Sequence, residues 1–340
     1  MLSVPVLSKV IPLSIVISMI LASILTEARP FISLSLIALV LYILFISMRW
    51  SWLAERFAGC RGSGRSRNII ARMQADKPGT DIVFLAHYDS KSQTIPISIR
   101  MLSLILFLPL LGIWIFLIIL KTSNILLIGS SPLLYLGLVS FLLILPHLLN
   151  FNGNRSPGAL DNASGVGVML ELARVIKENY RSSMPSFTFI ATGAEEEGLI
   201  GSIRFMKKHA GSFRKEQTFF INLDSPGAPG KTLLIDRCGI FARTRSGNLT
   251  KRFIESSRGQ GIHPVRRSLP PGIGVDSFPI SYRGFEAITL SSGTLNRTLL
   301  SMHTPDDSIG QIDGDVIENL ARSALAFSLS FSQAEPVQKT

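Results

Sequence analysis

The sequence predicts an α/β fold, a three-layer α/β/α sandwich with a mixed, largely parallel sheet, together with four transmembrane α-helices. Two observations lead to this prediction. In the polar part of the chain, short apolar strand patterns alternate with helical patterns, which is typical of a parallel sheet covered by helices. Elsewhere, four long apolar stretches carry almost no charge, and each approaches the roughly 20 residues that a helix needs to cross a bilayer.

Composition supports the membrane segments and argues against a nucleic-acid partner. The 340 residues are 47% hydrophobic and 17% charged, whereas a soluble domain carries about a quarter charged residues. The net charge of +11 comes from basic residues beside the apolar stretches and between Arg237 and Arg267. The sequence lacks zinc-finger spacing, a Gly-rich phosphate loop and an aromatic–basic ribonucleoprotein motif. We therefore expect the lipid bilayer as a partner and no nucleic acid.

The four apolar stretches are predicted to form two helical hairpins, made by residues 11–25 with 31–48, and by residues 101–120 with 125–149. A cleaved signal peptide is the alternative for the first stretch, and a buried core hairpin is the alternative for the last two. Basic residues flank the hairpins mainly on the side of the polar domain. The positive-inside rule therefore predicts a multi-pass integral membrane protein with its catalytic domain on the cytoplasmic face.

These segments divide the chain into four parts. An N-terminal transmembrane hairpin covers residues 1–50, and a second hairpin at 101–149 is inserted into a discontinuous polar domain at 51–100 and 150–335. Residues 336–340 are expected to be a disordered tail. Cys60 and Cys238 are too few for a disulfide framework, so we expect two unpaired thiols, with a single bridge as the alternative.

Within the polar domain, four apolar runs of strand length are predicted to be strands, at residues 81–86, 186–192, 217–223 and 287–290. Helical periodicity appears between and after them, at residues 165–179, 199–209 and 315–330. In open α/β sheets, ligands bind beyond the carboxyl ends of the strands. Polar side chains that follow these strands are therefore the candidate site residues.

Metal-ligand residue types cluster at these positions: His87 and Asp89, Asp161, Glu195 and Glu196, Asp224, and His303. Imidazole and carboxylate groups without a thiolate suit a hydrolytic zinc pair or a similar divalent metal. Each signal alone is weak, because a single histidine after a strand is often structural and a glutamate run is often solvated. Five such signals in order within one domain predict a metal site.

The blocks HYDS, PGALDNASG, EEEGLIGS, NLD and HTPDD resemble those of the co-catalytic di-zinc peptidases of bacterial leucyl aminopeptidase and glutamate carboxypeptidase type. Glutaminyl cyclases and the transferrin receptor are relatives of that family. The resemblance covers most of the polar domain but not the apolar helices. It implies a zinc exopeptidase fold, two zinc ions per chain and hydrolysis of peptide bonds.

The resemblance also implies a role for each site residue. His87 and Asp224 would bind one metal, Glu196 and His303 the other, and Asp161 would bridge the two. Glu195 would be the general base, taking a proton from a water held between the metals. Asp89 would orient His87, as Asp306 would orient His303, while Asp276 and Phe278 would contact substrate. Smaller expectations are that Asn162, Ser164 and Gly165 shape the turn beneath the metals and that Glu197 is structural.

The resulting functional prediction is a membrane-anchored metallo-aminopeptidase that acts on the N-terminus of a peptide or protein. Two alternatives stay open. Lys91 after HYDS and the helix sequence MLELARVI resemble glutaminyl cyclases, which would make the chain an aminoacyltransferase. An inactive peptidase-like membrane scaffold is the other. The inserted hairpin at 101–149 departs from soluble relatives and places the site towards the membrane, and Ser225-Pro226-Gly227 departs from the family after Asp224.

Overall fold

The structure, a computed structural model, describes residues 4–47, 65–76, 79–126, 128–180, 184–238, 246–269, 273–294 and 300–331. The chain divides into two compact units, Met1–Ser63 with Gln93–Gly153, and Gly64–Ser92 with Asn154–Thr340. The first is helical and the second contains a large sheet. Cys60 and the tail at 336–340 lie outside the described residues, so the expectations about them are not addressed.

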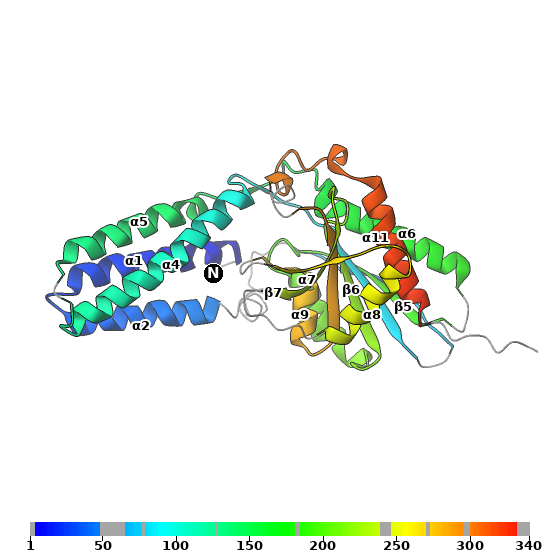
Figure 1. Ribbon diagram of the computed structural model, residues 1–340, viewed down its shortest axis with the longest axis horizontal. Helices are drawn as coiled ribbons and strands as arrows, with labels where there is room; N and C mark the ends of the chain where they lie inside the picture. The colour runs from blue at the N-terminus through cyan, green and yellow to red at the C-terminus, as the bar shows by residue number, and fades with distance from the viewer. Residues whose placement is uncertain are drawn as a thin grey trace, which may run out of the picture. The chain divides into compact units, whose positions relative to one another are not determined.

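Four helices form the described part of the first unit: α1 (Val4–Leu25), α2 (Pro30–Ser47), α4 (Ile97–Thr122) and α5 (Ser130–Leu148). They run side by side (Figure 1) around a shared apolar core that includes Met19, Val40, Trp114 and Leu133. Within the described residues, α4 and α5 are long and apolar enough to cross a membrane, while the apolar segments Lys9–Leu25 and Pro30–Phe45 are shorter.

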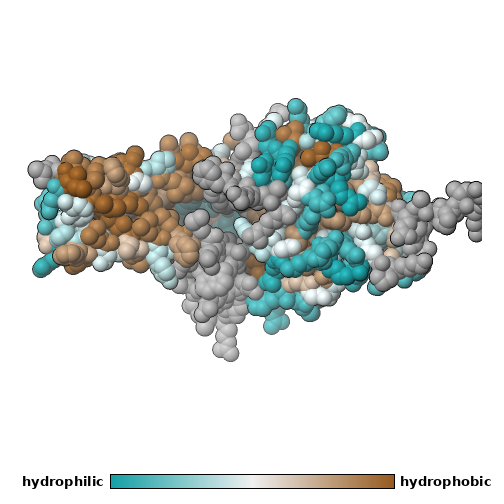
Figure 2. All heavy atoms as spheres, turned by 60° about the horizontal axis from the view of Figure 1, so that its bottom comes forward, coloured by the Kyte–Doolittle hydropathy of each residue, from teal (hydrophilic) through white to brown (hydrophobic). Residues whose placement is uncertain are grey.

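Large apolar side chains also cover the outside of this unit. Exposed examples occur on all four helices, such as Leu21, Tyr42, Phe116 and Leu142, and Figure 2 shows hydrophobic residues over much of the visible face of the unit. A soluble monomer rarely exposes so much contiguous apolar surface.

Inside the unit, the indole N–H of Trp114 donates to Ser23 Oγ at 2.9 Å, which satisfies the only polar group of the tryptophan side chain.

The second unit is built on one seven-stranded sheet among the described residues, with strand order β1-β5-β2-β6-β9-β7-β8. β5, β2, β6 and β9 are parallel, β1 and β7 are antiparallel to their neighbours β5 and β9, and β8 is parallel to β7. The strands are β1 (Ile69–Met73), β2 (Asp81–His87), β5 (Ser186–Thr192), β6 (Thr218–Leu223), β7 (Thr232–Cys238), β8 (Val265–Leu269) and β9 (Glu286–Ser292). Two-residue strands β3 (Ser92–Gln93) and β4 (Asn152–Gly153) lie where the chain leaves and re-enters this unit.

Helices cover both faces of the sheet (Figure 1). Alternate residues of β2 point to opposite faces: Ile82 and Phe84 join one core, and Val83 and Leu85 join the other. The first core is completed by α6 (Ser164–Asn179), α8 (Gly247–Arg258) and α11 (Gly314–Leu329), and the second by α7 (Ile200–His209) and α9 (Ser277–Tyr282). Short helical turns at Ala159–Ala163, Ala210–Ser212 and Ile309–Gln311 complete the described elements.

The expected α/β class and mixed sheet are confirmed, and the four predicted strands and three predicted helices lie within two residues of their observed ends. Strands β1, β7 and β8 and helices α8 and α9 were not predicted. β1 has exposed side chains at Ile69 and Ile70, and β8 carries Arg266 and Arg267 in its centre. β8 therefore lacks an apolar pattern, whereas β1 is apolar at four of its five positions but is an exposed edge strand.

Candidate metal centre

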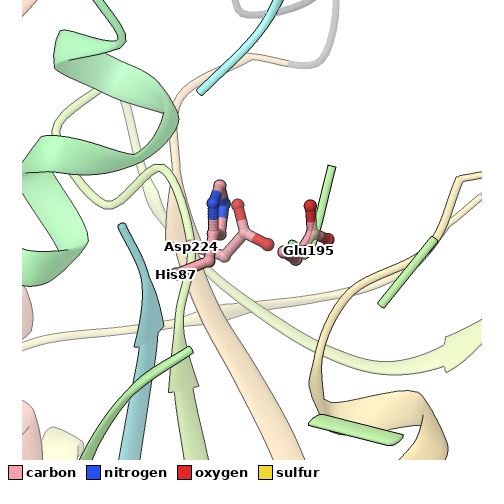
Figure 3. Close-up of side chains that lie close together, drawn as sticks. All are labelled: His87, Glu195 and Asp224. Atoms are coloured by element: carbon pink, nitrogen blue, oxygen red, sulfur yellow. The ribbon is translucent and has the colours of Figure 1, made fainter. Parts of the chain in front are cut away.

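Three neighbouring parallel strands bring candidate ligands to one edge of the sheet. His87 is the last residue of β2, Asp224 directly follows β6, and Glu195 and Glu196 follow the end of β5 by three and four residues. Because β5, β2 and β6 are adjacent in the sheet, residues far apart in the sequence meet there. Figure 3 shows His87 beside Asp224, with Glu195 next to this pair.

Asp161 connects the two histidines. Its Oδ1 lies 3.1 Å from Nε2 of His87, and its Oδ2 lies 2.9 Å from Nε2 of His303. Nε2 of His303 also lies 2.9 Å from Oε1 of Glu196. The ligand atoms thus form two triads, Asp161 with Glu196 and His303, and His87 with Glu195 and Asp224, each with its atoms within 4.8 Å of one another.

His87 is oriented through the backbone of Asp89. Nδ1 of His87 lies 3.0 Å from the Asp89 carbonyl oxygen and 3.9 Å from the Asp89 carboxylate. A carbonyl only accepts hydrogen bonds, so Nδ1 carries a proton, and Nε2 is the ring atom left to bind a metal or, when it is protonated, to donate to Asp161. The Asp89 carboxylate instead accepts the backbone N–H groups of Glu195 and Glu196, each at 3.2 Å. Asp89 therefore fixes both the histidine and the glutamate pair.

The turn that carries Asp161 is held from below by Asn162. Its side-chain amide donates to the Leu223 carbonyl at 2.8 Å, and its Oδ1 accepts the backbone N–H groups of Gly165 and Ser225, each at 3.1 Å. A Cβ on Gly165 would lie 2.2 Å from Asn162 Oδ1, so glycine is required there. These contacts join the Asp161 turn to the end of β6, and the peptide bond between Asp161 and Asn162 is cis.

Several non-glycine residues at the site adopt left-handed backbone conformations. The φ angle is 56° at Ala194, immediately before Glu195, 52° at Ser225, immediately after Asp224, and 62° at His303 itself. Each such conformation costs on the order of 1–3 kcal/mol for a residue with a Cβ, and strain of this kind gathers at functional sites. The surrounding fold therefore imposes the positions of these side chains.

Burial and mutual charge strongly shift the pKa values of the site residues. Burial lowers the pKa of both histidines, but the neighbouring carboxylates outweigh it and raise the pKa of His87 well above its ordinary value and that of His303 to about 9. Burial raises the pKa of Glu195 well above its ordinary value, and neighbouring carboxylates add to this. Burial likewise raises the pKa of Asp224 to about 7, with the negative charge of Asp161 among the contributing causes.

The arrangement fits bound divalent cations. Nε2 of His87 lies against one carboxylate oxygen, and Nε2 of His303 lies equally close to two carboxylate oxygens although it has at most one hydrogen to donate. Once both imidazoles are neutral, as metal ligands must be, four buried carboxylates with one lysine leave excess negative charge, which a metal pair would neutralise. Imidazole nitrogens and carboxylate oxygens are zinc ligands. The residues that would hold the two ions are His87, Asp161, Glu196, Asp224 and His303. Glu195 belongs to the triad of His87 and Asp224 and lies within reach of an ion there.

The contacts of Lys91 and Asp307 were missed in the sequence, and the expectation for Asp306 is wrong in this structure. Lys91 Nζ lies 2.8 Å from Oε2 of Glu196 and 2.8 Å from its carbonyl oxygen. Asp306 is exposed, whereas the adjacent Asp307 is fully buried and accepts the backbone N–H of Leu160 at 2.6 Å. The two consecutive carboxylates in HTPDD do not both face inward, and the motif does not indicate which of them does.

The residues expected to contact substrate lie beside the site. Asp276 is fully buried at the start of α9, and its carboxylate accepts a hydrogen bond from Thr192 at the end of β5. Phe278 is half-buried and packs against an apolar cluster that includes Ile235 and Val275. The structure thus gives Asp276 a bond to the sheet, and substrate contact by these two residues remains a prediction.

Comparison with known proteins places this arrangement in a family. The model of peptidase family M28 matches residues 68–328. Aminopeptidase YwaD of Bacillus subtilis (strain 168) is 33% identical over 170 residues, which cover 48% of this chain and 35% of YwaD. Human endoplasmic reticulum metallopeptidase 1 is 38% identical over 81 residues, covering 23% of this chain and 8% of that protein.

A solved structure shows the same fold. The LapA aminopeptidase of Legionella pneumophila superimposes with a TM-score of 0.52 at 16% sequence identity, covering 79% of this chain and 56% of LapA. The chain thus spans about a third of YwaD and just over half of LapA. The family match includes all the candidate ligands from His87 to His303, and the chain belongs to peptidase family M28.

Proposed function

We propose that this protein is a membrane-anchored, zinc-dependent exopeptidase that hydrolyses N-terminal peptide bonds. The observation that carries the proposal is the pair of ligand triads joined by Asp161, whose two oxygens each face one histidine. A bridging carboxylate of this kind suits two dications about 3.5–4 Å apart, as in two-metal hydrolases.

In this proposal the metal pair supplies Lewis acidity, polarising the scissile carbonyl and the attacking water. Glu195 is the general base: it takes a proton from that water and returns it to the leaving amine. The residue is only 8% exposed, so its carboxylate is shielded from bulk water beside the proposed metal position. Asp89 holds Glu195 in place through the backbone N–H group.

Similarity favours an aminopeptidase over a carboxypeptidase, because YwaD, which is 33% identical over 170 residues, is named an aminopeptidase.

Membrane anchoring by all four helices α1, α2, α4 and α5 is part of the proposal. Their outward side chains are apolar on each helix, which suits contact with lipid tails. The charged residues near the helix ends favour a catalytic unit on the cytoplasmic face. A membrane-associated peptide or protein N-terminus is then the proposed substrate, with the bilayer as the other partner.

The test is hydrolysis by the full chain, purified in detergent and supplied with zinc, of peptides with free or blocked N-termini. We expect cleavage of the free peptides alone. Glu195→Gln keeps the shape of the side chain but removes the base, so it should lower kcat by about 10²–10⁴-fold while zinc remains bound. Glu216→Gln removes the same charge from an exposed position and should leave kcat unchanged.

Other results would point to the alternatives. Peptides with N-terminal glutamine belong in the same panel, because their cyclisation without hydrolysis would support a glutaminyl-cyclase-like transferase. A folded chain that binds no zinc and turns over no peptide would support an inactive scaffold.

A further inference from the structure

A half-buried lysine contacts one of the proposed metal ligands directly. Lys91 Nζ lies 2.8 Å from Oε2 of Glu196, and the side chains of Lys91 and Glu196 are 18% and 7% exposed. The same ammonium group donates to the Glu196 backbone carbonyl at 2.8 Å. Lys91 therefore binds both the side chain and the main chain of a single residue, which lies 105 positions away in the sequence.

The two oxygens of Glu196 consequently face different partners. Oε2 is taken by Lys91, while Oε1 lies 2.9 Å from Nε2 of His303 and accepts no hydrogen bond from the described residues. Oε1 is the oxygen that faces the triad of Asp161, Glu196 and His303. Glu196 is thus restricted to a single oxygen as a ligand, because rotation to offer both would break the ion pair with Lys91.

The two triads also differ in the position of the nearest cation. The Asp161–Glu196–His303 triad has a lysine ammonium on the far oxygen of its glutamate. Both close polar contacts of this ammonium are with Glu196, which belongs to that triad alone. In a buried site, a positive charge within several ångströms of a bound dication opposes its binding. The same charge keeps the ligand in one orientation, which catalysis requires.

We infer that Lys91 is a positioning residue that holds Glu196 as a one-oxygen ligand and weakens zinc binding at the Asp161–Glu196–His303 position, so that the two metal positions load unequally. This inference rests on the proposed two-metal function. Lys91 then has two effects. Its contacts with Glu196 hold the ligand in the orientation that promotes turnover, and its positive charge lowers the affinity for zinc. Loss of a residue that only supports the fold would instead weaken binding and turnover together.

The experiment is a zinc titration of the metal-stripped full chain in detergent, in competition with a chromophoric chelator, beside kinetics on a free aminoacyl peptide. Wild-type protein should show two classes of site with unequal affinity. Lys91→Met removes the charge at similar side-chain length. It should tighten the weaker class by about tenfold or more while lowering kcat by about 10–100-fold, with little change in KM.

Two further variants test whether the charge of Lys91 causes the change in zinc affinity. Lys91→Gln removes the charge but keeps a hydrogen-bond donor for Glu196, so it should tighten the weaker class as Lys91→Met does and lose less turnover. Lys177→Met removes an exposed lysine from the last turn of α6 and should match wild type. If Lys91→Met fails to fold, Lys91→Gln alone decides the effect of charge on affinity.

Unchanged or weaker zinc binding in the folded Lys91 variants would overturn the inference, as would retention of full kcat in Lys91→Met. These outcomes differ from failure of the proposed function. A wild-type chain that binds zinc in two classes but hydrolyses no peptide contradicts the peptidase proposal alone, since the titration still measures the effect of Lys91.

Discussion

The carboxylate of Asp307 accepts the backbone N–H of Asp161 at 3.3 Å. The same carboxylate accepts the N–H of Leu160 at 2.6 Å, and the Asp307 carbonyl accepts the N–H of Ala159 at 3.1 Å. Asp307 thus binds the turn that carries the bridging ligand, and it lies four residues after His303. One buried side chain joins two segments that supply ligands to the same metal position.

Asp307→Ala should therefore damage both stability and metal binding. Each buried N–H left without an acceptor costs about 1–3 kcal/mol, so we expect the Tm to fall by several degrees. Because Asp161 loses its support, zinc affinity should fall about 10–100-fold. Differential scanning fluorimetry and chelator competition measure the two effects. Asp306→Ala, on the exposed neighbour, is the control, and an equal effect of both substitutions would contradict the assignment.

Gly165→Ala should destabilise the protein, because its Cβ would meet Asn162 Oδ1 at 2.2 Å and the Leu223 carbonyl oxygen at 2.5 Å. The clash should cost several kcal/mol of unfolding free energy, or about 1–3 kcal/mol if the turn shifts to relieve it. Gly167 lies two residues further along α6, and a Cβ added there would have no heavy atom within 4 Å outside its own helix turn. Gly167→Ala should instead stabilise the helix by about 0.5–1 kcal/mol. Equal Tm values for the two variants would show that the Asn162 turn tolerates a side chain.

Zinc binding should release protons at neutral pH. In the metal-free site the pKa of His303 is raised to about 9 and that of His87 lies well above its ordinary value, so both imidazoles carry an extra proton at pH 7. A zinc ligand must give up that proton, and Asp224, whose pKa is about 7, gives up a further fraction, so we expect at least two protons released per chain. Affinity should fall as the pH is lowered. Calorimetry in two buffers of different ionisation enthalpy measures the release, and buffer-independent heats would contradict it.

The proposed topology places the short turns of both hairpins on the side of the membrane opposite the catalytic unit. Ser123→Cys, just after α4, and Lys177→Cys, on α6, put exposed thiols in the turn and in the catalytic unit respectively. With Cys60 and Cys238 replaced by serine, an impermeant maleimide should label Ser123→Cys in intact cells and Lys177→Cys only after lysis. The reverse pattern would place the catalytic unit outside the cytoplasm.

The central strands could be located in the sequence because β2, β5, β6 and β9 are buried and their apolar runs are continuous. Helix α8 was missed because only Leu249, Phe253 and Ile254 are large and apolar among its twelve residues, although their spacing is that of a helix face. Edge strand β1 was missed because its exposed side chains lack a period of two. In each case, pairing with a distant strand or packing on the sheet decides the structure, and a local pattern does not record such contacts.

The candidate ligands could be identified because His87, Glu196 and Asp224 follow predicted strands and because the sequence blocks around all the ligands resemble those of the di-zinc peptidases. The residues that support them could not. Asp89 was expected to orient His87, and the structure shows that its carbonyl faces the ring while its carboxylate binds two backbone N–H groups. The contact of Lys91 with Glu196 spans 105 residues. Such partners depend on how turns are placed in three dimensions, which the motif does not encode.

The proposed mechanism requires that the ligands joined by Asp161 hold two metal ions and that peptide hydrolysis needs both. The most direct measurement is hydrolysis of a free aminoacyl peptide by the chelator-treated chain as zinc is returned in counted equivalents. We expect no hydrolysis by the folded metal-free protein, and recovery that reaches its maximum as the second zinc ion binds. Full hydrolysis by the metal-free chain, or a maximum that is reached before a second ion binds, would contradict the two-metal mechanism.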